Sequence, residues 1–109
     1  MADWTKQNLD DYFEALRKKD VSQVSGMFAS NATLTDENNR ILQGNDIKQY
    51  YNDFLTDAVN CNMVSFNGRG NEVYVAYTYP KPGSSDLVRA SARFFFEGGR
   101  IARLILELF

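Results

Sequence analysis

Acid–base chemistry in this sequence is restricted to carboxylates and tyrosines, because the chain contains no histidine. The absence of histidine excludes Ser-His-Asp triads, activated Cys-His pairs and histidine-liganded metal sites. The single cysteine, Cys61, cannot form an internal disulfide or a zinc site, and we expect it to be a small buried hydrophobe. We therefore expect no metal site and no cofactor. Any general acid or base must come from the 14 acidic residues or the six tyrosines.

One of these carboxylates, Asp36, lies at the predicted junction of a strand and a turn. Residues 32–35 and 40–42 flank the run Asp36-Glu37-Asn38-Asn39, whose side chains favour turns, so a short hairpin is predicted here. At that junction the side chain either points into the interior of the domain or caps the turn by accepting backbone hydrogen bonds.

Three amphipathic helices are predicted before and after this hairpin. The first extends from about Trp4 to Lys19, with Asp3 as its N-cap. A shorter helix follows Asp20, with an apolar stripe of Val21, Val24, Met27 and Phe28, and the residue pair Asp20 and Gln23 resembles a capping box. The third helix opens at residue 45 or 46 and ends near residue 57. The apolar stripe of the first helix is Leu9, Tyr12, Phe13 and Leu16, and that of the third helix is Ile47, Tyr50, Tyr51, Phe54 and Leu55.

The second half of the chain has the period of two that is typical of β-strands. Residues 72–79 alternate between two faces, and Gly98-Gly99 joins residues 87–97 and 100–108 as a hairpin. An antiparallel meander is therefore predicted. One face of its hairpin carries no charge and is expected to face the interior: Val88, Ala90, Ala92, Phe94 and Phe96.

Helices that precede a long, curved antiparallel sheet pack on one of its faces, which predicts an α+β fold. With 109 residues, of which 44% are hydrophobic, the chain is expected to form one domain over residues 1–109. The net charge of −2 and the dispersed lysines and arginines argue against nucleic acid as a partner. The chain has no long apolar run, so we expect no membrane segment and a cytoplasmic location.

The opposite face of the last hairpin mixes apolar and charged side chains. A sheet face of this kind is suited to burial against a partner, and we expect a symmetric homodimer through it. The residues expected on this outer face include Arg89, Arg93, Phe95, Ile101 and Ile105.

Four segments in a fixed order resemble the nuclear transport factor 2-like superfamily, which includes ketosteroid isomerase-like and SnoaL-like polyketide cyclase proteins. They are YFEALRKKDVSQVSGMFASNATLTD, GNDIKQYYNDF, NEVYVAYTY and RFFFEGGRIARL. The resemblance spans nearly the whole chain. It implies a cone-shaped, cystatin-like fold in which about three N-terminal helices pack on one face of a curved antiparallel sheet.

The resemblance to ketosteroid isomerases also implies residue roles. In those enzymes an aspartate moves a proton alpha to a carbonyl group, and this base aligns with Asp36. The tyrosine that binds the oxyanion aligns with Tyr12, and the tyrosine that supports it aligns with Tyr51. Ala92 stands where the isomerases have a protonated aspartic acid, and loss of one such donor typically slows catalysis by about 10²–10³-fold. The residues expected to contact substrate are Tyr51, Phe13, Phe28, Phe54, Ala92 and Phe94.

Three functions fit these observations. The first is proton transfer on a small hydrophobic carbonyl compound with Asp36 as general base and Tyr12 as donor. The second is a domain that binds a small hydrophobic molecule without chemistry, which the alanine at position 92 favours. The third is a dimerisation or protein-interaction module that uses the outer sheet face. Under this last interpretation side chains fill the interior. Whatever the function, Tyr12 and Tyr51 have the alternative of being core tyrosines whose hydroxyls pair with each other or with backbone.

Overall fold

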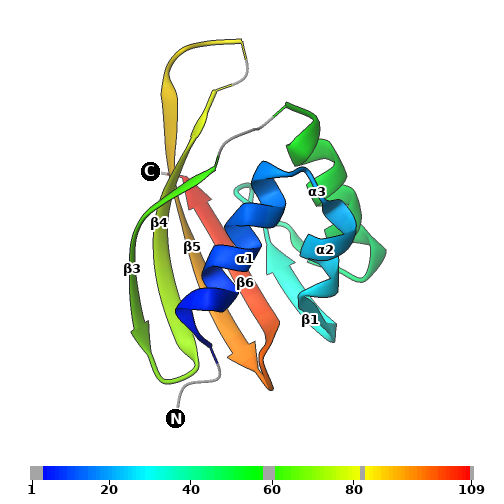
Figure 1. The fold of residues 1–109 in the computed structure, drawn as a ribbon. Coiled ribbons are helices and arrows are strands. Elements are labelled where there is room, and N and C mark those ends of the chain that lie inside the picture. Colours follow the sequence, from blue (N-terminus) through cyan, green and yellow to red (C-terminus); the bar gives the residue numbers. More distant parts are fainter. Residues whose placement is uncertain (1–3, 58–60, 82, 109) are drawn as a thin grey trace.

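The helices cover one face of a curved six-stranded sheet in the computed structural model, which describes residues 4–57, 61–81 and 83–108 (Figure 1). The predicted α+β fold is confirmed. Within this part of the chain, no helix is long and apolar enough to cross a membrane. In chain order the elements are α1 (Lys6–Arg17), α2 (Val21–Gly26), β1 (Phe28–Thr35), β2 (Ile41–Gln43), α3 (Asn45–Asp57), β3 (Asn62–Arg69), β4 (Glu72–Pro80), β5 (Leu87–Glu97) and β6 (Arg100–Leu108).

The strand order is β2-β1-β6-β5-β4-β3. Strands β3 to β6 form the predicted antiparallel meander, and the predicted hairpin of β1 and β2 is also present. The two groups of strands are joined by a parallel pair, β1 with β6. The last described strand, β6, therefore lies inside the sheet, between β1 and β5.

The ends of the first two helices differ from the prediction. The N-cap of α1 is Thr5, whose hydroxyl accepts a hydrogen bond from the backbone N–H of Asn8 at 3.1 Å while the Asn8 side chain accepts from the Thr5 N–H at 2.8 Å. Asp3 lies outside the described residues. The α2 helix is capped by Asp20 as predicted but ends at Gly26, because Phe28 pairs with β6 and begins β1.

Aromatic rings fill the space between α1 and the sheet. Every member of the predicted α1 stripe is buried, and the Tyr12 ring lies 5.1 Å from both the Phe13 and the Phe94 rings. The predicted inner face of β5 is likewise buried from Ala90 to Phe96. This part of the interior is packed core.

Ile101 does not lie on the outer face, where strict alternation placed it. The register between β5 and β6 shifts after Phe95, so that Ala102 is an extra residue between the pairs Phe95–Arg103 and Phe96–Ile101. Such a bulge moves a side chain to the other face of the sheet. Ile101 is fully buried as a result, and Phe95 and Ile105 remain half-buried on the outer face.

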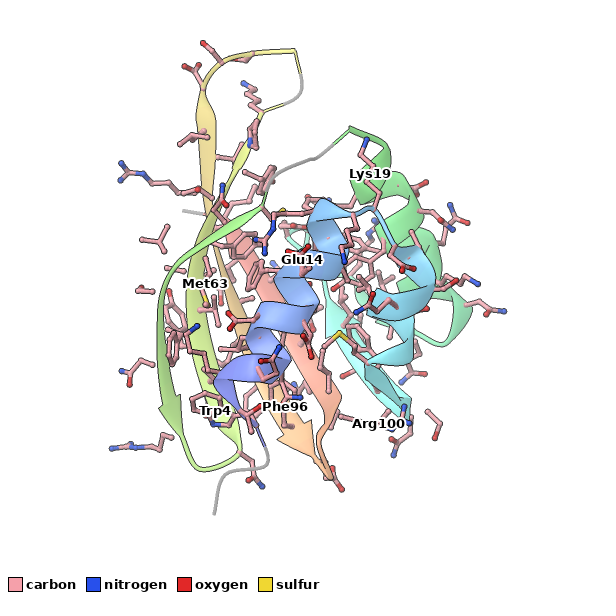
Figure 2. All side chains as sticks on the ribbon, in the orientation of Figure 1. Trp4, Glu14, Lys19, Met63, Phe96 and Arg100 are labelled. Carbon is pink, nitrogen blue, oxygen red and sulfur yellow. The ribbon has the colours of Figure 1, made fainter. Side chains whose placement is uncertain are left out.

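The segment before α1 is held against the β3–β4 hairpin by Trp4. Its indole N–H donates to the carbonyl of Gly70 at 3.1 Å, and its ring contacts Phe66 edge-on with centroids 6.0 Å apart. Figure 2 shows Trp4 beside the turn that joins β3 and β4. The ring lies so close to Gly68 that a Cβ atom at this position would overlap it.

Candidate functional site

A cleft opens at the end of the interior where α3 meets the β1–β2 turn. Its volume is about 690 Å³, within the range of about 300–1,000 Å³ that is usual for small-molecule sites. Side chains from the turn, β2, α3, β4 and β6 line it. They include Glu37, Leu42, Tyr50, Phe54, Tyr79 and Leu108.

Glu37 is the carboxylate that the β1–β2 turn places in this cleft. The Tyr50 hydroxyl donates to both of its oxygens, at 3.0 and 2.8 Å. Burial raises the pKa of Tyr50, and the negative charge of Glu37 raises it further, so this phenol stays protonated and remains a donor. Burial and the Glu37 charge also raise the pKa of Tyr79, which lines the same cleft. The Glu37 carboxylate therefore shares the cleft with two neutral phenols, and Asp46 and Asp53 are two further carboxylates among the lining residues.

Asp36, the predicted base, is buried directly beside this site, and its oxygens are occupied by its own turn. The backbone N–H groups of Asn38 and Arg40 donate to Oδ1 at 2.9 and 3.0 Å, and the Arg40 guanidinium donates to Oδ2 at 2.8 Å. Burial opposes ionisation of Asp36, but these three hydrogen bonds outweigh it and hold the pKa of Asp36 below its usual range. Asp36 is not among the residues that line the cleft.

Tyr12 and Tyr51 meet in the core. Their hydroxyl oxygens are 2.6 Å apart and both side chains are buried. Burial raises the pKa of both phenols well above the usual value. Neither residue lines the cleft, so the structure brings these two together without joining them to an open site that contains Asp36.

The other predicted contact residues divide in the same way. Phe54 lines the cleft, whereas Phe13, Ala92 and Phe94 lie in the core against α1 or the sheet. Phe28 is buried at the start of β1, and it lines a separate hollow of about 180 Å³. Cys61 is buried as predicted, and burial raises the pKa of its thiol to about 12.

Three residues of the cleft, Glu37, Tyr50 and Tyr79, were absent from the predicted site. The sequence does hold a signal for Glu37, because an aspartate two residues before an asparagine favours a turn in which the aspartate accepts the backbone N–H. Such a turn occupies Asp36 and leaves the next carboxylate to point elsewhere.

Among the described residues, no group of three or more histidine, cysteine, aspartate and glutamate side chains is arranged to hold a metal ion.

The curved sheet with helices on one face is the cone-shaped fold of nuclear transport factor 2-like proteins. The SnoaL-like domain model matches residues 9–104, and the chain therefore belongs to the SnoaL-like family. Among curated protein sequences, none matches this chain.

Solved structures support the same fold. SalBIII, an epoxide hydrolase/cyclase-like enzyme of pyran ring formation in salinomycin, has a TM-score of 0.84 at 20% identity, with 95% of this chain and 89% of that chain covered. SMa1630 of Sinorhizobium meliloti, a candidate polyketide cyclase, has a TM-score of 0.80 at 25% identity, with 93% and 94% covered. A designed protein with a curved β-sheet scores 0.83 at 12% identity, with 95% and 84% covered, so the fold by itself specifies no activity.

Proposed function

We propose that the cleft binds a small hydrophobic carbonyl compound and that Glu37 moves a proton on it. The observation that carries this proposal is the placement of the Glu37 carboxylate in the cleft, within hydrogen-bond distance of Tyr50. Leu42, Phe54, Tyr79 and Leu108 supply apolar and aromatic surface in the same cleft. Asp36, which the resemblance to ketosteroid isomerases assigns as the base, has both oxygens engaged by its turn. We assign it instead the role of fixing the turn that carries Glu37.

In the proposed reaction the Glu37 carboxylate accepts a proton from the carbon alpha to the carbonyl group. The electron pair of the broken C–H bond forms a carbon–carbon double bond, and the carbonyl oxygen takes the negative charge. Tyr79, a neutral phenol in the same cleft, is positioned to donate to that oxygen. Glu37 then returns the proton to the same carbon or to another carbon of the substrate.

The test is exchange of the alpha protons of beta-tetralone with deuterated solvent, followed by proton NMR, for the wild type and two single variants. Glu37→Gln keeps the shape of the side chain and removes the base, so the exchange rate should fall by about 10²-fold or more. Asp36→Asn removes a carboxylate that does not line the cleft but loosens the turn that carries Glu37. At a temperature where this variant is folded, its exchange rate should fall by less than that of Glu37→Gln.

If Asp36→Asn abolished the exchange and Glu37→Gln kept the wild-type rate, Asp36 would be the base, as the resemblance implies. Saturable binding of the ketone with no exchange in the wild type would contradict the proton transfer and support the alternative of a non-catalytic binding domain. The cleft itself favours that alternative over a pure interaction module.

A further inference from the structure

The cleft carries an excess of negative charge. Glu37, Asp46 and Asp53 line it, and Arg40 is the one cationic side chain among its described lining residues. The guanidinium of Arg40 is already paired with the buried Asp36 carboxylate at 2.8 Å. This pairing cancels the single positive charge, so three carboxylates act on whatever occupies the cleft.

Two of these carboxylates share one face of α3 with an aromatic residue. Asp46, Tyr50 and Asp53 are spaced by four and three residues, which places their side chains along the same side of the helix. An anionic ligand, such as a carboxylate or phosphate, would meet like charges along this wall. A cation would meet attractive charges at both ends of it.

Three aromatic rings also line the cleft. The rings of Tyr50 and Phe54 are nearly parallel, at 8° with centroids 5.9 Å apart, and the Tyr79 ring is at 80° to Phe54 with centroids 5.3 Å apart. The faces of aromatic rings attract cations, most strongly where water is displaced. Carboxylates and aromatic rings around one cleft are the groups that recognise ammonium ions.

We propose that the ligand of this cleft carries a cationic nitrogen, a protonated or quaternary amine. The proposal rests on the proposed function in that it names the substrate of the same cleft: a carbonyl compound with an ammonium group directed toward Asp46 and Asp53. A cleft of this kind should also reject carboxylates and phosphates of similar size.

The test is binding, measured by NMR titration at low ionic strength with three probes. Phenyltrimethylammonium is the cation, tert-butylbenzene is its neutral isostere and phenylphosphonate is an anion. The cation should bind about tenfold more tightly than the neutral isostere, shift the ring signals of Tyr50, Phe54 and Tyr79, and lose affinity as salt is added. The anion should show no saturable binding.

Two variants separate the contributions of charge and ring. Asp53→Asn keeps an acceptor for the Gln49 side-chain amide and removes a charge, and Phe54→Leu keeps an apolar side chain and removes a ring. Each should weaken binding of the cation by about threefold or more and leave binding of the isostere within twofold. Glu97→Gln, which removes a charge at the end of β5 away from the cleft, is the matched control and should change neither.

Binding of the isostere or the anion as tight as that of the cation would overturn the proposal. So would an Asp53→Asn variant that binds the cation like the wild type. The two proposals can fail separately. If the wild type binds the cation selectively but exchanges no alpha protons, the cation selectivity is supported and only the proposed proton transfer is contradicted.

Discussion

Replacement of Asp36 by asparagine should destabilise the protein, because three hydrogen bonds converge on this buried carboxylate. A hydrogen bond to a charged group contributes about 1.5–3 kcal/mol. Asparagine keeps one acceptor oxygen for the two backbone N–H groups but turns its amide donor toward Arg40. The Arg40 side chain is largely exposed, so loss of its ion pair with Asp36 contributes less to the destabilisation than the backbone hydrogen bonds do. We expect the free energy of unfolding to fall by about 2 kcal/mol, which lowers Tm by about 8–16 °C in a domain of this size.

The loss should depend on pH in a defined direction. The pKa of Asp36 is lowered in the folded state, so its contribution to stability is complete above the unfolded-state value of about 3.9. The contribution is lost as the pH falls through the lower pKa of the folded state, because a protonated Asp36 resembles asparagine. The difference in stability between wild type and Asp36→Asn should therefore be constant near neutral pH and shrink in acid.

Thermal unfolding followed by circular dichroism at neutral and acidic pH measures both effects. Asp10→Asn is the control, since Asp10 forms an exposed ion pair with Lys6 and its loss should change the free energy of unfolding by less than about 1 kcal/mol. An Asp36→Asn variant as stable as the wild type at pH 7 would refute the assignment of Asp36 to the turn. A difference that does not shrink in acid would refute the role of its charge.

Three further predictions concern the buried tyrosine pair, the approach of Trp4 to Gly68 and the outer face of the sheet. Tyr51→Phe should lower the free energy of unfolding by about 1–3 kcal/mol, because it leaves the buried Tyr12 hydroxyl without its partner. Adding Tyr12→Phe should recover stability, as measured by chemical denaturation, and no recovery would contradict the pairing. Gly68→Ala should displace the Trp4 ring and red-shift its fluorescence, and an unchanged spectrum would contradict the close approach. We expect a homodimer through the outer sheet face that Phe95→Glu dissociates in sedimentation velocity, and a monomeric wild type would exclude it.

The helices and the meander were predictable because their signals are local. Apolar residues at helical spacing predicted a helix from residue 45 or 46 to near residue 57, and α3 spans Asn45–Asp57. Two adjacent glycines located the turn between β5 and β6. The position of Ile101 was not predictable in this way. Strict alternation holds only while the register is regular, and the extra residue Ala102 is a property of how two strands pair.

The candidate site shows a similar limit. The sequence marked the β1–β2 turn as the source of a carboxylate, but the residue it named was Asp36, and the residue that lines the cleft is the adjacent Glu37. That choice depends on the direction of each side chain within the turn, which three hydrogen bonds to Asp36 determine. The position of the open cleft depends on where α3 and the turn meet, which no local pattern encodes.

The parallel pairing of β1 with β6 has a consequence for synthesis of the chain on the ribosome. Strand β6 lies between β1 and β5, so Phe28 finds its partner Ile101 only after nearly every other element has been translated. Until then β1 and β2 form a lone hairpin with an unpaired edge, and a two-stranded hairpin is marginally stable in water. The nascent chain must therefore shield this hairpin with its helices, or with a chaperone, until translation supplies the strand that completes the sheet.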